Sequence, residues 1–280
     1  MSTNVPNIQL NDGRTIPQLG FGVWQVPNDE ATQAVRDAIE AGYRLIDTAE
    51  AYKNEEGVGR AVRDCGIPRE QFFITSKLRN GGHAFDDAMA AFDETQRKLG
   101  LDYLDLFLIH WPVPEQDKYV DAWKALVQLK EQGRVRSIGV SNFLPEHLDR
   151  IIDATGVTPV VNQIELHPQY QQRDVRGIHA QRDIRIECYS PLGSGAVLKD
   201  ETIKAIADKH GKSVAQIILR YLLDQDLIVI PKSTHADRIQ ENIDVFGFSL
   251  DDEDRRTIDA LDDPKNGKTG SHPATMNALF

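Results

Sequence analysis

Four residues of this sequence could together transfer a proton. Each of them ends, or closely follows, a short apolar run. Asp47 and Tyr52 belong to the first run, Lys77 ends the second, and His110 follows the third. A free tyrosine has a pKa of about 10, so its phenol exchanges protons poorly at neutral pH unless a cation stabilises the phenolate. If the three runs are neighbouring parallel strands, their carboxyl ends bring the four side chains to one face.

These four side chains make chemical sense as a proton-transfer site. We expect Lys77 to lower the pKa of Tyr52, and Asp47 to keep that lysine charged and oriented. His110 would donate a hydrogen bond to a substrate oxygen. Taken singly, each has a plainer explanation: Asp47 and Lys77 as a structural ion pair, Tyr52 as a loop aromatic in water, and His110 as a packing residue. Their occurrence at successive strand ends favours proton transfer.

An alternation of apolar runs and amphipathic segments supplies the elements that must position these residues. The pattern predicts strands at 19–24, 43–47, 72–77, 103–109, 135–140, 160–164, 184–189 and 227–230. It predicts helices at 29–41, 54–65, 84–99, 119–132, 145–154, 173–182, 200–210, 213–224, 236–245 and 251–261. Eight strand–helix units, without a Pro-rich linker or a break in composition, favour one closed barrel over an open doubly wound sheet.

We therefore expect a single domain over residues 1–280 with an α/β fold: a (β/α)8 TIM barrel with an N-terminal β-hairpin and extra C-terminal helices. The hairpin is predicted at 8–17, around Asp12-Gly13, as a lid or plug. The tail at 264–280 is predicted to be a loop over one mouth of the barrel. Because active sites of such barrels lie at the carboxyl ends of the strands, polar residues there point to function.

Composition and charge narrow the class of protein. The formal net charge of −11 argues against a nucleic-acid partner, because phosphate backbones bind clustered Lys and Arg. The two cysteines, Cys65 and Cys188, fit a reducing compartment. We find neither a signal peptide nor an apolar run of about 20 residues, and the histidines lack the spacing of a zinc site. We expect a cytoplasmic monomer with no membrane partner and no metal.

Polar and aromatic residues also follow the later predicted strands. Ser141 and Asn142 follow the fifth strand, Gln163 lies in the sixth, and Tyr189 ends the seventh. At the carboxyl ends of barrel strands, such residues point to function. Strand capping and ordinary barrel packing explain each residue about as well when it is taken alone.

A cationic, hydroxyl-rich cluster lies at the start of the last barrel helix. Its members are Lys232, Ser233, Thr234 and Arg238. Backbone amides and the helix dipole already favour an anion at such a position. A solvated basic patch is the plainer alternative. No Gly-x-Gly-x-x-Gly follows a strand and opens a helix, so a Rossmann domain is not needed.

At these residues the sequence resembles the aldo-keto reductases, and among them the bacterial group related to 2,5-diketo-D-gluconate reductase. The motifs that carry the resemblance are GYRLIDTA at 42–49 with Tyr52, GVSNF at 139–143, NQIELHP at 162–168 and IPKS at 230–233. They occur in the order of the family and span nearly the whole chain. The resemblance implies hydride transfer from NADPH to an aldehyde or ketone, with Tyr52 as general acid and Asp47, Lys77 and His110 as its catalytic partners.

The resemblance also assigns the cofactor site. Residues matching Ser141, Asn142 and Gln163 would hold the nicotinamide amide, and Tyr189 would stack on its ring. The 2′-phosphate would be held by Lys232, Ser233, Thr234 and Arg238, and the adenine would meet Glu241 and Asn242. The remaining predicted cofactor contacts, several of them along the pyrophosphate, are Val23, Trp24, Asp47, Ser190, Leu192, Gly193 and Ser194.

Departures from the family pattern bear on the substrate. Arg79 stands where many relatives carry an aromatic wall, so we predict that it binds an anionic carbonyl compound such as a keto-sugar acid; small dicarbonyls are the alternative. Leu45 replaces a histidine that is frequent in the first motif. Trp24 and Trp111 are predicted to wall the substrate pocket together with Tyr52 and His110, although simple packing would also explain either tryptophan.

Two other classes of protein remain open at this stage. A Schiff-base aldolase would use a strand lysine as its nucleophile, and Lys77 and Lys232 both qualify by position. A nucleotide-sensing regulatory subunit could use the same scaffold, because fold does not fix function. Borohydride trapping would reveal the aldolase, whereas only turnover separates a reductase from a sensor.

Overall fold

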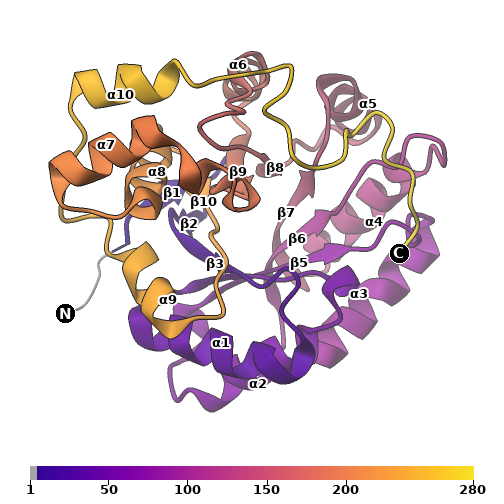
Figure 1. Ribbon diagram of the computed structural model, residues 1–280. Coiled ribbons are helices and arrows are strands. Elements are labelled where there is room, and N and C mark those ends of the chain that lie inside the picture. The colour runs from indigo at the N-terminus through magenta and orange to yellow at the C-terminus, as the bar shows by residue number, and fades with distance from the viewer. Residues whose placement is uncertain (1–4) are drawn as a thin grey trace.

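The computed structural model describes residues 5–280 as a parallel barrel surrounded by helices (Figure 1). The barrel strands are β3 (Gly20–Gly22), β4 (Leu45–Asp47), β5 (Phe73–Leu78), β6 (Leu104–Ile109), β7 (Val135–Ser141), β8 (Val161–Glu165), β9 (Arg185–Tyr189) and β10 (Ile228–Val229). Neighbouring strands in the sheet are neighbours in the chain. Leu19 bridges in parallel to Val229, whose N–H donates to the carbonyl of Gln18 at 2.9 Å. This bridge closes the predicted (β/α)8 barrel, which is confirmed.

The helices form the outer layer around the barrel (Figure 1), and their buried apolar residues belong to the core. They are α1 (Asn28–Ala41), α2 (Glu55–Asp64), α3 (Phe85–Leu99), α4 (Tyr119–Glu131), α5 (Pro145–Thr155), α6 (Arg173–Gln181), α7 (Glu201–His210), α8 (Val214–Leu223), α9 (Ala236–Ile243) and α10 (Asp252–Asp259). Side-chain caps fix several starts. Asp200 accepts from the N–H groups of Thr202 and Ile203 before α7, and Ser213 accepts from Gln216 N–H before α8.

The N-terminal hairpin closes the amino end of the barrel. Its strands are β1 (Asn7–Gln9) and β2 (Thr15–Pro17). Ile8, Leu10 and Ile16 are buried in one cluster with apolar residues from inside the barrel. The Asn11 side chain donates to the carbonyls that precede β8 and β9, those of Pro159 and Asp183, at 3.0 Å each. The hairpin is thus a plug, as the sequence predicted.

The C-terminal tail lies over the opposite, carboxyl end. Figure 1 shows it in yellow, running from α10 past α6 and α5. Asn80, which follows β5, donates to the carbonyl of Ala278 at 2.8 Å. The predicted loop over one mouth of the barrel is therefore observed.

The first and last barrel strands are shorter than predicted. β3 ends at Gly22 and β10 at Val229, although Gly22 N–H still donates to the carbonyl of Pro231 at 3.0 Å. Pro231 has no N–H with which to continue a ladder, so regular pairing stops at this edge. Within residues 5–280, no helix is long and apolar enough to cross a bilayer.

Candidate active site

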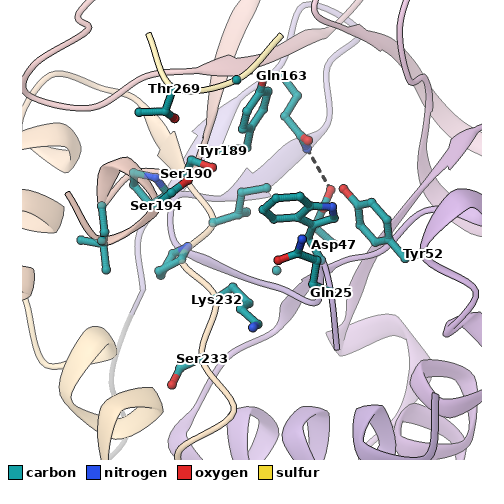
Figure 2. Close-up of a pocket in the computed structure, with 18 of the residues that line it drawn as sticks. Gln25, Asp47, Tyr52, Gln163, Tyr189, Ser190, Ser194, Lys232, Ser233 and Thr269 are labelled. Carbon is teal, nitrogen blue, oxygen red and sulfur yellow. Dashed lines mark hydrogen bonds between the residues drawn. The ribbon is translucent and has the colours of Figure 1, made fainter. Parts of the chain in front are cut away.

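A cavity of about 1100 Å³ opens at the carboxyl ends of the barrel strands. Figure 2 shows side chains from opposite sides of the barrel pointing into it. The predicted site residues that line it are Trp24, Asp47, Tyr52, His110, Trp111, Ser141, Asn142, Gln163, Tyr189, Ser190, Leu192, Ser194, Lys232, Ser233, Thr234, Arg238, Glu241 and Asn242. The predicted site residues outside its lining are Val23, Lys77, Arg79 and Gly193.

Lys77 lies beneath the floor of the cavity and joins Asp47 to Tyr52. Its Nζ is 2.5 Å from Asp47 Oδ1, 2.9 Å from the carbonyl oxygen of Thr48 and 3.4 Å from the hydroxyl of Tyr52. Lys77 is fully buried. Strands β4 and β5 are paired in parallel, and Tyr52 is carried by the short helix η1 (Glu50–Tyr52) that follows β4. Adjacent strand ends therefore bring the three groups together.

His110, directly after β6, completes this group. Its ring meets that of Tyr52 edge-on, with centroids 5.6 Å apart. Its Nδ1 is buried and has no hydrogen-bond partner among the described residues. The residue also lines the cavity, so part of its ring borders the space that a substrate would occupy.

Burial and the ion pair set the charges of the group. Burial alone would lower the pKa of Lys77, but Asp47 and Tyr52 outweigh it and raise the pKa, so the ammonium stays charged. Burial, helped by the charge of Lys77, holds the pKa of His110 well below its usual range. At neutral pH the site thus contains a charged Lys77 and a neutral His110.

Lys77 lowers the pKa of Tyr52, as expected, but the net pKa of the phenol is raised. Burial is the largest influence and raises the pKa of the phenol; Lys77 lowers it, but does not overcome the burial. Asp47 also works against Lys77, because its negative charge disfavours a phenolate nearby. Tyr52 is consequently protonated at neutral pH, and the lysine is placed to stabilise the phenolate once the proton has left.

A polar wall faces Tyr52 across the cavity. The hydroxyl of Tyr189 donates to Asn142 Oδ1 at 2.8 Å, and Asn142 Nδ2 donates to the carbonyl of His110 at 3.1 Å. Ser141 donates to the carbonyl of Gln163 at 2.9 Å. Gln163 Nε2 donates to Asp47 Oδ2 at 2.8 Å, the bond dashed in Figure 2. These bonds hold amide groups in fixed orientations beside the ring of Tyr189.

The predicted cationic cluster lies at the rim of the cavity, before and within α9. Lys232 and Arg238 are exposed, and neither has a carboxylate within 4.0 Å in residues 5–280. Ser233 is buried, and its hydroxyl accepts from the N–H of His235 at 3.1 Å. Glu241 is engaged by the hydroxyl of Ser213 at 2.6 Å. The rim offers two unpaired cations to an anionic ligand.

Two predicted cofactor residues, Val23 and Gly193, are not part of the cavity lining. Val23 is fully buried, and its carbonyl accepts from Asn54 Nδ2 at 2.9 Å. Gly193 has φ +57°, and a Cβ there would collide with the side chain of Val197. The contact of these two residues with a cofactor stays a prediction of the family resemblance.

Arg79 is not part of the cavity lining, and its role in substrate binding stays a prediction. Its guanidinium forms an ion pair with Glu50 at 2.5 Å, and its N–H donates to the same carboxylate at 3.3 Å. Glu50 opens η1, the helix that carries Tyr52. The sequence alone gave no sign of this pairing, since the two residues are far apart in the chain. Arg79 thus supports the position of Tyr52.

Aromatic side chains form the outer part of the cavity. Trp24 is 51% exposed, whereas Trp111 is almost completely buried, and both line the space. Phe280, from the tail, meets the ring of His110 edge-on at 5.7 Å. The sequence predicts only a covering loop here, but Phe280 of the tail also forms part of the cavity wall beside His110.

Two buried glutamates, Glu165 and Glu187, have contacts near the site that the sequence does not predict. Glu165 accepts from Lys268 Nζ at 2.9 Å, Thr269 N–H at 2.6 Å and Gly270 N–H at 3.0 Å, which fastens the tail to β8. Glu187, in β9, accepts from Gln163 Nε2 at 2.8 Å. Glu165 lies within the NQIELHP motif, and Glu187 lies two residues before Tyr189. Their closeness in the chain to predicted site residues is the sequence feature that could have pointed to them.

Known proteins resemble this chain over nearly its full length. A protein of Mycolicibacterium smegmatis named aldo-keto reductase is 51% identical over 272 residues, covering 97% of this chain and 98% of its own. Methylglyoxal reductase DkgA of Escherichia coli K12 is 50% identical over 260 residues, covering 92% and 94%.

Solved structures give the same result. A Gox0644 variant in complex with NADPH superimposes with a TM-score of 0.94, at 51% identity and with 99% of each chain covered. A Bombyx mori aldo-keto reductase in complex with NADP has a TM-score of 0.88, at 39% identity and with 95% of each chain covered. The sequence pattern of the aldo/keto reductase family matches residues 18–263. The chain belongs to the aldo/keto reductase family.

Proposed function

We propose that this protein reduces a small aldehyde or ketone with NADPH and that Tyr52 gives the proton to the carbonyl oxygen. The observation that carries the proposal is the contact of one buried lysine, Lys77, with both Asp47 and the hydroxyl of Tyr52 at the floor of the cavity. The NADPH and NADP complexes of similar structures support the choice of cofactor.

The residues of the cavity fit a nicotinamide dinucleotide phosphate. Asn142 and Gln163 are held in place for a carboxamide, and the ring of Tyr189 lies beside them. Lys232 and Arg238 offer charge to the 2′-phosphate. The volume of about 1100 Å³ exceeds that of pockets for most small ligands, roughly 300–1,000 Å³, and leaves room for a substrate.

Each catalytic side chain has a distinct task in the reduction. Bound NADPH supplies the hydride for the carbonyl carbon. Tyr52 holds the proton at neutral pH because burial raises the pKa of its phenol, and Lys77 stabilises the phenolate that remains after transfer. Asp47 keeps Lys77 charged. His110, a neutral donor, can hold the carbonyl oxygen without adding a competing cation.

The substrate end of the cavity favours a small neutral carbonyl compound. Trp111 and Phe280 flank His110, and Arg79 is paired with Glu50. Among the described lining residues, the Lys and Arg side chains belong to the segment around the start of α9. A dicarbonyl such as methylglyoxal therefore suits the walls better than a keto-sugar acid, in line with the name of the DkgA relatives.

Loss of reduced-nicotinamide absorbance tests the proposal directly. Methylglyoxal, simple aldehydes and 2,5-diketo-D-gluconate should be compared with NADPH and with NADH. We expect turnover with NADPH and a higher kcat/KM for methylglyoxal than for the acid. A protein whose fluorescence NADPH quenches, but which consumes NADPH with none of these compounds, would be a nucleotide sensor.

The aldolase alternative has weaker support from the geometry. A Schiff base requires a neutral amine, whereas Asp47 and Tyr52 raise the pKa of Lys77 against its burial and keep it charged. Lys232 is exposed at the rim and is not part of the group around Tyr52. Borohydride in the presence of a ketone should leave both lysines unmodified, and a covalent adduct on either would reverse this conclusion.

A further inference from the structure

Glu187 is a buried carboxyl group that the proposed chemistry does not use. It lies in β9 with no exposed surface, and it is not part of the cavity lining. Its Oε2 accepts from Gln163 Nε2 at 2.8 Å, and its Oε1 has no hydrogen-bond partner within residues 5–280. Burying a polar group without a hydrogen-bond partner lowers the stability of a protein, so the buried carboxyl group of Glu187 needs an explanation.

The bond to Glu187 is the second of two hydrogen bonds that the side-chain nitrogen of Gln163 donates. Gln163 Nε2 has two hydrogens; one is donated to Asp47 Oδ2 and the other to Glu187 Oε2, each at 2.8 Å. Turning the amide over would lose both donated bonds and place its carbonyl oxygen against the acceptor Oδ2 of Asp47, which is unfavourable. The nitrogen of Gln163 is therefore held in the interior, and its carbonyl oxygen is left for the cavity that the residue lines.

We propose that Glu187 is a positioning residue which, together with Asp47, fixes the amide of Gln163 so that its carbonyl oxygen accepts a hydrogen bond from the nicotinamide carboxamide. Asp47 by itself supplies one acceptor and leaves the amide able to rotate about that bond. The second acceptor, from the neighbouring strand, removes this freedom. The inference rests on the proposed use of NADPH and adds the residue that orients one of its contacts.

The charge of Glu187 is compatible with this role. Burial, and then the negative charge of Asp47, raise the pKa of Glu187 to about 8. The charged and titratable groups that interact with it are Asp47, Lys77, Tyr52 and Cys188. Near neutral pH its carboxyl group is mostly protonated, and a proton on Oε1 leaves Oε2 as an acceptor. The hydrogen bond to Gln163 thus forms without a second negative charge beside Asp47.

Binding of three ligands to two variants tests the inference. Glu187→Met removes the acceptor at similar length, and Glu187→Gln keeps a carbonyl acceptor. The ligands are NADPH, its 3-acetylpyridine analogue, which has a methyl in place of the amide nitrogen, and 2′,5′-ADP, which has no nicotinamide. Dissociation constants come from fluorescence quenching or calorimetry, with thermal unfolding as the check that each variant is folded.

We expect Glu187→Met to weaken NADPH about fivefold, the value of one modest hydrogen bond, and to leave 2′,5′-ADP and the analogue unchanged. Glu187→Gln should bind NADPH within about twofold of the wild type. Thr75→Val is the matched control, because Thr75 lies beside Asp47 in the register and its buried hydroxyl has no partner in the described chain. It should bind all three ligands like the wild type.

Several results would overturn the inference. Unchanged NADPH binding by Glu187→Met would do so, and so would equal weakening of 2′,5′-ADP, which indicates general damage. If Glu187→Met does not fold, the side-chain amide protons of Gln163 in the wild type decide by NMR: slow exchange with water supports two fixed bonds, and fast exchange of one proton contradicts them. Failure of the wild type to bind NADPH would instead refute the proposed function.

Discussion

The two ends of the barrel are built from the same strands but have opposite chemistry. At the amino end, Ile8, Leu10 and Ile16 of the hairpin are buried against apolar residues from inside the barrel. At the carboxyl end, a cavity of about 1100 Å³ opens, with Asp47 and Tyr52 in its lining and Lys77 beneath its floor. The comparison teaches that one end of each strand contributes stability and the other end contributes function, as the barrel architecture permits.

The largest expected effect is at the carboxyl end. Tyr52→Phe removes the proposed general acid, and we expect kcat to fall by about 10³-fold, within the range of such catalysis. NADPH affinity and the midpoint of thermal unfolding should change little, because the hydroxyl makes a single long contact to Lys77 at 3.4 Å. Steady-state kinetics, quenching and calorimetry measure the three quantities. A variant that retains a tenth of the activity would show that another group gives the proton.

The opposite pattern is expected at the amino end. Ile16 is completely buried in the plug, so Ile16→Ala should lower the free energy of unfolding by about 2–4 kcal/mol. Urea denaturation measures this loss, and kcat for folded protein should match the wild type. Ile8→Ala, at a position with 8% exposure, should cost less. A large fall in kcat for either variant would mean that the two ends are coupled.

A carboxyl group at each end of the barrel should make stability depend on pH in a different way. Because Glu187 has its pKa raised to about 8 in the folded protein, the folded state binds a proton that the unfolded chain releases near pH 4.5. Stability of the wild type should therefore fall relative to Glu187→Gln as pH rises through this window, with a limiting slope of about 1.4 kcal/mol per pH unit. Urea midpoints at several pH values measure the difference.

Asp12 of the plug is the control for this pH effect. Burial alone would raise the pKa of Asp12, but bonds from Ser137, Arg14 N–H and Lys130 outweigh it and lower the pKa. Its contribution is present above the ordinary pKa of 3.8 and is lost only in acid. The stability difference between Asp12→Asn and the wild type should thus stay constant from about pH 5 to 8. A slope there, or none for Glu187→Gln, would contradict these assignments.

The smallest expected effect lies at the rim. Lys232→Ala removes one exposed cation from the proposed 2′-phosphate site, so we expect the Kd for NADPH to rise about tenfold and that for NADH to stay the same. Lys199→Ala makes the same charge change at an exposed position outside the cavity lining and should affect neither. Equal losses for both cofactors in Lys232→Ala would place the 2′-phosphate elsewhere.

The sequence by itself determined the barrel, the plug and the convergence of Asp47, Tyr52, Lys77 and His110. Strand and helix periodicities are local, and parallel strands bring their carboxyl ends to one side, so chain order was enough to gather these residues. The four motifs also carry the resemblance to the aldo/keto reductase family.

Only the tertiary structure decided which partner each charged group meets and how deeply it is buried. Arg79 pairs with Glu50 outside the cavity lining, and Glu187 reaches Gln163 inside the barrel. The pKa of Tyr52 is raised because burial outweighs the charge of Lys77. A period of two residues tells which side of a strand points inward, but contacts across the barrel and the loss of hydration depend on how all eight strands close.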